Sequence, residues 1–351
     1  MKEYLNAQAV ASLLGWYREN KRDLPWRRTK DPYCIWLSEI MLQQTRVEAV
    51  KPYYARFLKV CPTVEALAEV DEKRLMKLWE GLGYYSRARN LQKAARTVMT
   101  EYGGRMPTTY AELKKLSGIG DYTAGAIASI AFDERVPAID GNVLRVLARV
   151  SGSREDIANP ATKTKWREAL APCVPQDAGD FTQAMIELGA TVCVPNGEPK
   201  CQSCPLAAHC VALKERLTDE IPVRSAKKAR RIEPLTVLII RDGDRTALCK
   251  RPDKGLLAGL YELPNVKGHL DEAELPAYIR SLGFEPLRIE RLEDAKHIFT
   301  HIEWHMIAYA VKITPEFDGL HGKSGMLLVQ NDDLHEHYAI PSAFGAYTKY
   351  L

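Results

Sequence analysis

The chain has 351 residues, a net charge of +4 at pH 7, and charged and apolar fractions of 27% and 46%. This length favours two domains that each bury a core, and the ordinary composition argues against a disordered or fibrous protein. No apolar run approaches transmembrane length, so we expect no membrane span. The eight cysteines, in a chain without a recognisable targeting segment, are expected to be reduced thiols or metal ligands rather than disulfides.

The charge is unevenly distributed. Between Val223 and Ile232 there are five Lys and Arg and no acidic residue. From Glu233 to the C-terminus, 13 Lys and Arg face 18 Asp and Glu, which leaves residues 1–222 with a net charge of +4. This distribution predicts a domain over 1–222, a basic linker over 223–233 and an acidic domain over 234–351, with nucleic acid on the first two.

Residues 1–222 are expected to be nearly all helical. Apolar residues recur at helical spacing between Val10 and Tyr17, which predicts an amphipathic helix rather than a signal peptide at the N-terminus. The next strongly apolar segment, Ile35 to Val47, contains one acidic residue, Glu39. Glu39 is either an exposed residue on the polar side of a helix, or a desolvated carboxyl whose raised pKa lets it act as an acid near neutral pH.

Two polar stretches suit contact with nucleic acid. Gln43, Gln44 and Thr45 carry no charge and can hydrogen-bond base edges or fill a gap in a duplex; the alternative is a polar helix end. Leu78 to Asn90 combines glycines, tandem tyrosines and two arginines, which suits stacking on bases and pairing with phosphates. Core tyrosines beside a solvated basic face remain the competing interpretation.

Leu116 to Ala124 reads Leu-Ser-Gly-Ile-Gly-Asp-Tyr-Thr-Ala, so two glycines separate one predicted helix from the next. Glycine tolerates a positive φ and lets a partner approach closely. Free N–H groups at the start of the second helix attract an anion such as a DNA phosphate. The stretch predicts a helix–hairpin–helix over about residues 113–133; the alternative is an ordinary turn between helices.

Asp140 follows an apolar stretch and is expected to cap the helix that begins after it. One helix separates it from the hairpin, so the chain can return it to the same surface. With Glu39 it would supply the two carboxyls that cleavage of a glycosidic bond requires. One protonates the leaving group, and the other stabilises or traps the oxocarbenium-like sugar.

Four cysteines within eighteen residues predict a metal site. Cys193, Cys201, Cys204 and Cys210 are separated by seven, two and five residues. Structural zinc and a [4Fe–4S] cluster both accept four thiolates, so the spacing leaves the metal open. The other four cysteines are scattered and are expected to be buried thiols.

The pattern changes beyond residue 233. Leu235 to Arg241 and Thr246 to Arg251 flank Asp242-Gly243-Asp244, which predicts a β-hairpin. His297 to Ile313 predicts a second strand-rich block, and a short helix is expected near residues 271–282. The tail is therefore expected to be a separate α+β domain.

Together these stretches resemble the adenine DNA glycosylases of the MutY type, in the endonuclease III-like helix–hairpin–helix superfamily, over almost the whole chain. The resemblance implies a mainly α N-terminal region, a six-helix barrel with the helix–hairpin–helix plus an iron–sulfur helical lobe, followed by an α+β Nudix-like domain. It implies a monofunctional DNA repair glycosylase that hydrolyses the N-glycosidic bond of adenine opposite 8-oxoguanine or guanine in double-stranded DNA and leaves an abasic site. A cytoplasmic, nucleoid-associated monomer is expected for a bacterial source.

The resemblance also implies roles for individual residues. Glu39 matches the catalytic acid, Asp140 the carboxylate that stabilises the sugar cation, and Tyr122 and Asn142 the groups that orient these two. The resemblance implies that Arg27 lines the adenine pocket. It implies that seven further residues contact the duplex or the lesion: Gln44, Thr45, Leu82, Tyr84, Phe299, Thr300 and His301. The implied phosphate-binding residues are Gly118, Gly120 and Thr123.

The cysteines Cys193, Cys201, Cys204 and Cys210 match the ligands of a [4Fe–4S] cluster by this resemblance. A monovalent or divalent cation at the hairpin, on the carbonyls of Lys114, Leu116 and Ile119, is left open. Two positions depart from the family. The first cysteine gap has seven residues instead of six, a change that is cheap in loop-closure entropy. Thr300 replaces the serine of Phe-Ser-His, a change that keeps the hydroxyl and adds a methyl group.

Three other functions account for parts of this pattern. An endonuclease III-like lyase acting on oxidised pyrimidines would carry Lys where Tyr122 stands and would lack the long tail. A Nudix pyrophosphohydrolase needs an Arg-Glu-x-x-Glu-Glu cluster, but Glu262, Glu272 and Glu274 lack that spacing. A non-enzymatic DNA-binding module held by zinc would leave Glu39 and Asp140 without a role.

Overall fold

The computed structural model describes Met1 and residues 3–226, 229–314 and 325–351. These residues form two compact units. The helical unit comprises Met1–Glu69 and Arg89–Ala226, and the sheet unit comprises Val70–Ala88 and Lys227–Leu351. A short early segment of the chain is thus grouped with the C-terminal part, a division that the sequence pattern does not indicate.

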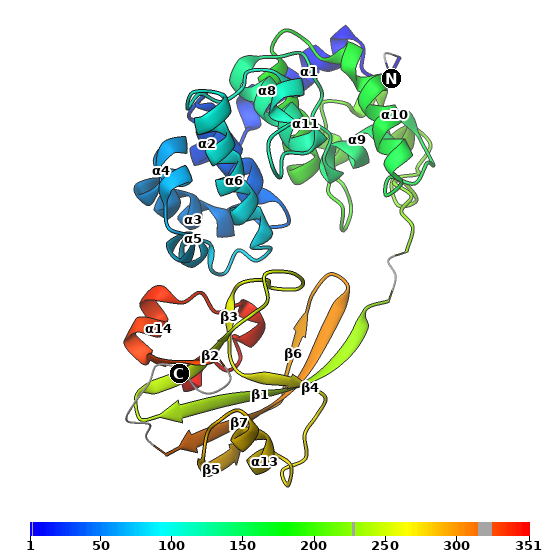
Figure 1. Cartoon of the computed structure of the whole chain (residues 1–351). Helices are drawn as coiled ribbons and strands as arrows, with labels where there is room; N and C mark the ends of the chain where they lie inside the picture. Colours follow the sequence, from blue (N-terminus) through cyan, green and yellow to red (C-terminus); the bar gives the residue numbers. More distant parts are fainter. Residues whose placement is uncertain (2, 227–228, 315–324) are drawn as a thin grey trace. The chain divides into compact units, whose positions relative to one another are not determined.

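The helical unit is built from helices (Figure 1) that bury apolar side chains against one another. Its first helix confirms the amphipathic prediction, because Val10, Leu13, Leu14 and Tyr17 are all buried. The helices are α1 (Ala7–Asn20), η1 (Pro25–Arg27), α2 (Pro32–Leu42), α3 (Val47–Val60), α4 (Val64–Glu69), α6 (Ser86–Glu101, whose first three residues belong to the sheet unit), α7 (Tyr110–Leu113), α8 (Asp121–Phe132), α9 (Gly141–Ser151), α10 (Pro160–Leu170), η2 (Ala171–Cys173), α11 (Ala178–Thr191), η3 (Cys201–Ser203), η4 (Ala207–His209) and α12 (Val211–Lys214).

Helix α11 organises the part of this unit that carries the site, because it packs against α1, α8 and α9. Two glycines permit the close approach. A Cβ on Gly179 would lie 2.9 Å from the carbonyl oxygen of Ser129, and one on Gly189 would lie 2.6 Å from Cβ of Asn142. Any larger residue at these positions would push α11 away from α8 or α9.

The sheet unit is an α+β domain, as predicted. Its strands are β1 (Arg231–Asp242), β2 (Arg245–Lys250), β3 (Tyr261–Glu262), β4 (Asn265–Lys267), β5 (Pro286–Arg291), β6 (Ala295–Ile298), β7 (Ile302–Ile313) and β8 (Leu327–Gln330). Its helices are α5 (Glu72–Trp79), α13 (Leu275–Ser281), α14 (Asn331–His337), η5 (Ser342–Phe344) and η6 (Thr348–Tyr350).

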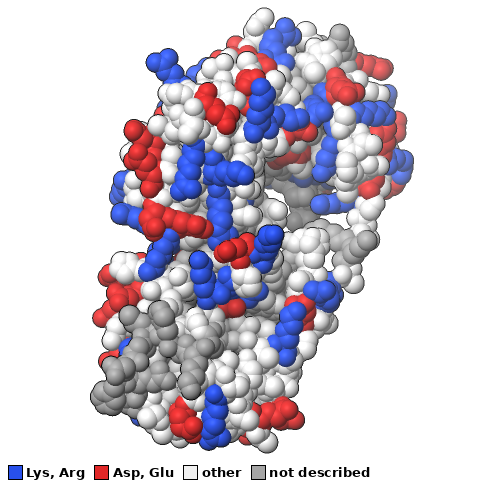
Figure 2. Space-filling model, viewed as in Figure 1, with Lys and Arg blue, Asp and Glu red and all other residues white. Residues whose placement is uncertain are grey.

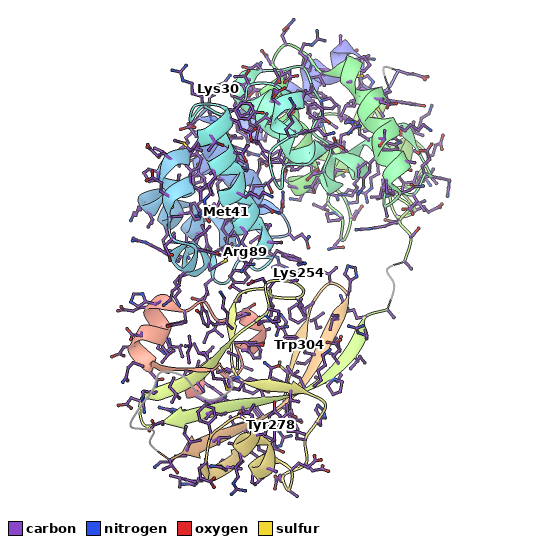
Figure 3. The ribbon with its side chains drawn as sticks, viewed as in Figure 1. Lys30, Met41, Arg89, Lys254, Tyr278 and Trp304 are labelled. Atoms are coloured by element: carbon purple, nitrogen blue, oxygen red, sulfur yellow. The ribbon has the colours of Figure 1, made fainter. Side chains whose placement is uncertain are left out.

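The sheet has the order β3-β2-β1-β7-β5, with β4, β6 and β8 paired to its members. The predicted hairpin is confirmed, since β1 and β2 pair antiparallel with Asp242 opposite Arg245. Strands β1 and β7 pair in parallel along their length, and core residues cover both faces of this pair. Figure 3 shows Met41 among the helices and Trp304 beside the strands, each inside its own unit.

The stretch predicted as a linker over 223–233 contains two residues, Lys227 and Lys228, that lie outside the described residues. At one end, Val223 accepts a backbone hydrogen bond from Ile157 of the helical unit. At the other end, Arg231 begins strand β1 opposite Ile302 of β7. The sequence did not indicate this strand start, because it depends on pairing with a strand some seventy residues later.

Of the four scattered cysteines, only Cys61 is fully buried as predicted, whereas Cys34, Cys173 and Cys249 are partly exposed. None of the described helices is long and apolar enough to span a membrane. In Figure 2, Lys and Arg side chains gather on the visible face of the helical unit, and α6, which carries four basic residues, lies on this face.

Candidate active site

A cleft of about 1210 Å³ in the helical unit brings together ten of the predicted site residues. Helices α2, α8, α9 and α11 and the loops that flank them supply most of its walls. The ten residues are Arg27, Glu39, Gln44, Thr45, Gly118, Gly120, Tyr122, Thr123, Asp140 and Asn142. Residues that are more than one hundred positions apart in the sequence therefore share one cavity.

Glu39 is an acidic residue of the cleft whose pKa is strongly changed by its surroundings. It lies on α2 among apolar side chains and is only 7% exposed, so the exposed alternative is wrong. Tyr122 donates a hydrogen bond from its hydroxyl to Oε2 of Glu39 at 2.6 Å. Burial raises the pKa of Glu39 to about 7, and the charge of Asp140 adds to this, while the bond from Tyr122 and the charge of Arg27 oppose it. Near neutral pH, Glu39 is therefore present in both protonation states.

Asp140 is fixed by the start of α9, which it caps as predicted. Its Oδ1 accepts a hydrogen bond from the N–H of Val143 at 2.8 Å, and its Oδ2 accepts one from Nδ2 of Asn142 at 2.7 Å. Burial raises the pKa of Asp140, but these two hydrogen bonds stabilise its charged form and limit the rise. The cleft thus contains two carboxyls in different environments: Glu39 can hold a proton near neutral pH, whereas two hydrogen bonds oppose the effect of burial on Asp140.

Two buried arginines of α9 that were not predicted from the sequence bind the cysteine-rich segment, and the first of them, Arg145, also supports Asn142. Arg145 donates from Nη2 to Oδ1 of Asn142 at 2.9 Å and from Nε to the carbonyl oxygen of Cys193 at 2.7 Å. Arg149, one turn later, donates from Nη1 to Sγ of Cys193 at 3.4 Å. Arg145 thus connects the cysteine-rich segment to the carboxylate of Asp140 through Asn142, and Arg149 adds a second bond to Cys193. Their presence inside an apolar helical run was the available sequence signal.

Glu187 of α11 was not predicted from the sequence either. Its side chain is completely buried. It accepts hydrogen bonds from Arg22 and, at 2.9 Å, from Nη2 of Arg27. These partners lower the pKa of Glu187 to about 2 despite its burial. Arg27 also lies over the ring of Tyr17, with 5.5 Å between its Cζ and the ring centroid. Arg27 is thus held on several sides where it lines the cleft.

The predicted hairpin lies between α7 and α8. Gly118 has a φ of +76°, and a Cβ there would lie 2.7 Å from Cβ of Asn90, so glycine is required on both counts. Gly120 begins α8 with a negative φ, and no side chain caps the N–H groups of the first turn. Asp121 in that turn is neutralised by Lys114 and Arg167, which contribute to lowering its pKa to about 2. The α8 N-terminus therefore keeps free donors and little net negative charge.

Two of the residues predicted to enter the duplex have strained backbones. Gln44, at the end of α2, has a φ of +60°, and Tyr84, in the sheet unit, has a φ of +48°. A positive φ is costly for residues other than glycine and is found most often at functional sites. Gln44 lines the cleft, whereas Tyr84 belongs to the other unit and is 46% exposed.

The remaining predicted residues, Leu82, Phe299, Thr300 and His301, also belong to the sheet unit. Phe299 packs edge-on against Trp304, with 4.9 Å between ring centroids, so it anchors the turn between β6 and β7 to the core. Thr300 and His301 at this turn are exposed. The hydroxyl groups of Thr300 and Tyr84 are 2.9 Å apart and hydrogen-bonded, and Leu82 is buried.

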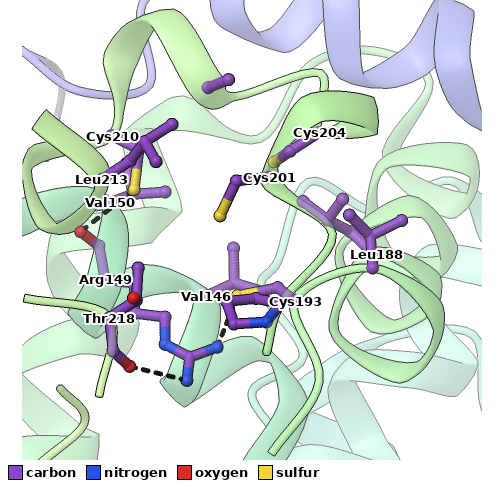
Figure 4. Close-up of a pocket in the computed structure, with 13 residues that line it drawn as sticks. Val146, Arg149, Val150, Leu188, Cys193, Cys201, Cys204, Cys210, Leu213 and Thr218 are labelled. Atoms are coloured by element: carbon purple, nitrogen blue, oxygen red, sulfur yellow. Dashed lines mark hydrogen bonds between the residues drawn. The ribbon is translucent and has the colours of Figure 1, made fainter. Parts of the chain in front are cut away.

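The four clustered cysteines line one small pocket in the helical unit (Figure 4). Val146 and Val150 of α9 and Leu188 of α11 form apolar walls, and burial raises the pKa of Cys204 to about 12. In the described part of the chain, no group of three or more His, Cys, Asp or Glu residues is placed to hold a single metal ion.

The chain matches the model of the HhH-GPD superfamily of base excision DNA repair proteins over residues 37–172 and that of the NUDIX domain over residues 236–349. The solved structure of a thermostable thymine-DNA glycosylase is 29% identical and superposes with a TM-score of 0.54, covering 59% of this chain and 95% of that one. A non-covalent complex of endonuclease III with DNA is 25% identical, with a TM-score of 0.51 and coverage of 59% and 94%.

Curated relatives extend the similarity beyond the helical region. The adenine DNA glycosylase of Mus musculus is 36% identical over 362 residues, which cover 86% of this chain and 70% of the relative. The adenine DNA glycosylase of Buchnera aphidicola subsp. Acyrthosiphon pisum (strain APS) is 32% identical over 319 residues, which cover 89% and 88%. With a cleft that holds two differently tuned carboxyls and with relatives that match over most of its length, the chain belongs to the adenine DNA glycosylase family.

Proposed function

We propose that the protein removes adenine from double-stranded DNA by hydrolysing its N-glycosidic bond, opposite 8-oxoguanine or guanine, and leaves an abasic site without cutting the strand. The observation that carries this proposal is the buried carboxyl of Glu39, whose pKa is raised to about 7 in the same cleft as Asp140. Relatives named adenine DNA glycosylase support the choice of base. The enzyme acts as a cytoplasmic, nucleoid-associated monomer.

In this mechanism the duplex is bound at the hairpin, and adenine is rotated out of the stack into the cleft. Protonated Glu39 donates its proton to N7 of adenine, which makes the base a better leaving group. As the C1′–N9 bond breaks, the carboxylate of Asp140 stabilises the positive charge on the sugar. Water then adds to C1′ and loses a proton. Tyr122 and Asn142 hold Glu39 and Asp140 in place through the hydrogen bonds described above.

Several residues are assigned to the duplex or to the base opposite adenine. Gln44 and Thr45 of the helical unit and Leu82, Tyr84, Phe299, Thr300 and His301 of the sheet unit are assigned to the duplex or to the lesion. The strained backbones of Gln44 and Tyr84 support this assignment. At the hairpin, Gly118, Gly120 and Thr123 are assigned to a phosphate, and the uncapped first turn of α8 supports this.

The proposal includes a [4Fe–4S] cluster on Cys193, Cys201, Cys204 and Cys210. The shared pocket, its apolar walls and the Arg149 guanidinium beside Sγ of Cys193 suit thiolates bound to such a cluster. The four cysteines would hold such a cluster through their thiolates, since all four line the same pocket. When bound, the cluster would tie together the segment from Cys193 to Cys210, on which Arg145 and Arg149 also depend.

We expect the purified protein to be yellow-brown, with broad absorbance near about 400 nm from thiolate-to-iron charge transfer, and to contain close to four iron atoms per chain. Replacing Cys201 by serine should lower the iron content and the colour together, while Cys249→Ser, in the sheet unit, should change neither. Iron and sulfide analysis with the absorption spectrum checks this. A colourless protein that contains zinc would refute the cluster assignment.

The proposed function is tested by single-turnover incubation with duplexes that carry adenine opposite 8-oxoguanine, guanine or thymine, followed by alkali. We expect strand breaks only after alkali, and fastest release opposite 8-oxoguanine. Release of thymine or of an oxidised pyrimidine instead of adenine would refute the proposal.

Replacing Thr300 by valine removes the hydroxyl that bonds to Tyr84 but keeps the size of the side chain. We expect the ratio of rates opposite 8-oxoguanine and opposite guanine to fall about fivefold, the factor for one hydrogen bond of ordinary strength. His301→Ala should have an effect of the same kind, and Thr348→Val, remote in the sequence, should have none. Equal ratios in all four proteins would leave the turn between β6 and β7 without its assigned role.

A further inference from the structure

The segment Val70–Ala88 contacts the C-terminal part of the chain at a site that none of the assigned functions uses. Helix α5 contacts α14 within the sheet unit. Beyond α5, Oε1 of Glu80 accepts a hydrogen bond from the N–H of Ile340 at 2.8 Å. On α5, Nζ of Lys77 donates to the carbonyl oxygen of Tyr338 at 3.1 Å, and Lys77 and Glu80 are also ion-paired at 2.7 Å. The pair therefore bonds to two backbone groups of residues 338–340.

The partner side of this contact is rigid. Ile340 is buried in the core of the sheet unit. The ring of Tyr338 packs edge-on against Tyr261, with 4.7 Å between ring centroids. The ammonium group of Lys73, also on α5, lies 3.7 Å from the centre of the Tyr338 ring. Residues 338–340 thus form a fixed support for the end of α5.

Glu80 ends α5 and is followed by the short loop that leads to Tyr84. This loop is held internally, because Nε1 of Trp79 donates to the carbonyl oxygen of Gly83 at 3.1 Å and Nη2 of Arg87 donates to that of Leu82 at 2.8 Å. A loop with such bonds and a strained φ at Tyr84 has little freedom of its own. The position of Glu80 therefore determines where the Tyr84 hydroxyl meets Thr300.

A simple surface ion pair would not justify a functional role, because such pairs contribute little. Here each charged group also bonds to a backbone group, and hydrogen bonds that involve a charge are stronger and more directional than neutral ones. The side chains of Lys77 and Glu80 are only 25% and 30% exposed. These features favour a positioning role over incidental pairing.

We propose that Glu80 and Lys77 are positioning residues that hold Tyr84 against Thr300 and thereby set the preference for 8-oxoguanine over guanine opposite adenine. They contact neither the substrate nor the reacting atoms. This inference rests on the lesion recognition included in the proposed function.

The test compares Glu80→Ala with Glu48→Ala in the full-length protein. Glu48 forms an ion pair with Lys51 at the same spacing of three residues, at 2.8 Å, but on α3. Single-turnover rates are measured opposite 8-oxoguanine and opposite guanine, and amide hydrogen exchange is followed for residues 80–84 and 338–341. For Glu80→Ala we expect about a fivefold lower rate ratio, as for loss of one hydrogen bond, and faster exchange in both segments. Glu48→Ala should match the parent protein.

Glu80→Gln keeps an oxygen that can accept from Ile340 and should restore most of the rate ratio. Combining Glu80→Ala with Thr300→Val should cost little more than either change alone, because both break the same connection. An unchanged ratio in Glu80→Ala, or unchanged exchange, would overturn the positioning role. If the parent protein itself shows no preference for 8-oxoguanine, the lesion part of the proposed function fails, and the exchange data alone decide whether Glu80 holds the loop.

Discussion

Replacing Glu39 by glutamine is expected to lower the rate of adenine release by about 10²- to 10⁴-fold, the contribution of a positioned general acid. Glutamine keeps the shape of the side chain and can still accept the hydrogen bond of Tyr122, but it has no acidic proton. Binding to duplex DNA should therefore remain close to that of the parent protein. Glu65→Gln, on the exposed side of α4, is a matched control that should retain full activity. Release of adenine by Glu39→Gln at the parental rate would show that another group is the acid.

The pH dependence gives an independent check on Glu39. Because its pKa is about 7, the protonated fraction falls as the pH rises above 7, and the single-turnover rate should fall with it.

The raised pKa of Glu39 also affects the stability of the fold. A carboxyl whose pKa is higher in the folded than in the unfolded state lowers the free energy of unfolding as the pH rises from about 4.5 to about 7. Above pH 7 the loss is complete and is on the order of 3 kcal/mol. Glu39→Gln removes this cost, so thermal unfolding at pH 8 should show a more stable variant that is nevertheless inactive.

Replacing Tyr122 by lysine is expected to convert the enzyme into one that cuts the strand. An amine at this position can attack C1′, form a Schiff base and permit β-elimination. The tyrosine cannot do this, and burial next to Glu39 raises its pKa well above the usual value, so its hydroxyl stays protonated. The parent protein should therefore give strand breaks only after alkali and little covalent complex with borohydride.

The Tyr122→Lys variant should also release adenine more slowly, because an ammonium group next to Glu39 would lower the pKa of Glu39. Tyr122→Phe is the matched control: it loses the hydrogen bond to Glu39 at 2.6 Å but gains no amine. It should slow adenine release without any strand cleavage. Efficient borohydride trapping and strand scission by the parent protein, without alkali, would instead support a lyase.

The residues that could be predicted from the sequence are those that belong to local patterns. Glu39 stands out in an apolar run, Gly118 and Gly120 frame the hairpin, and Asp140 caps a helix beside them. Each of these features needs only its neighbours in the chain to be recognised. The cleft that unites them follows from helix packing and is found only in the structure.

The supporting residues could not be predicted in the same way. In the sequence, Glu187 looks like any other glutamate in a helix. The structure shows that it binds Arg22, which is 165 residues away in the chain. Arg145 and Arg149 find their partners in a segment nearly fifty residues later. Buried charges of this kind are stable only when tertiary contacts satisfy them, and a single sequence carries no direct sign of those contacts.

The grouping of Val70–Ala88 with the C-terminal residues has a consequence for how the chain is made. The acceptor on Glu80 is synthesised early, but its donor on Ile340 leaves the ribosome about 260 residues later. At the usual rate of synthesis, about 5–20 residues per second, this delay lasts on the order of ten to fifty seconds. Throughout that time the end of α5 lacks its partner, and a chain truncated before Tyr338 never acquires it. Termination before Tyr338 should therefore disturb the segment Val70–Ala88, although that segment is synthesised about 260 residues earlier.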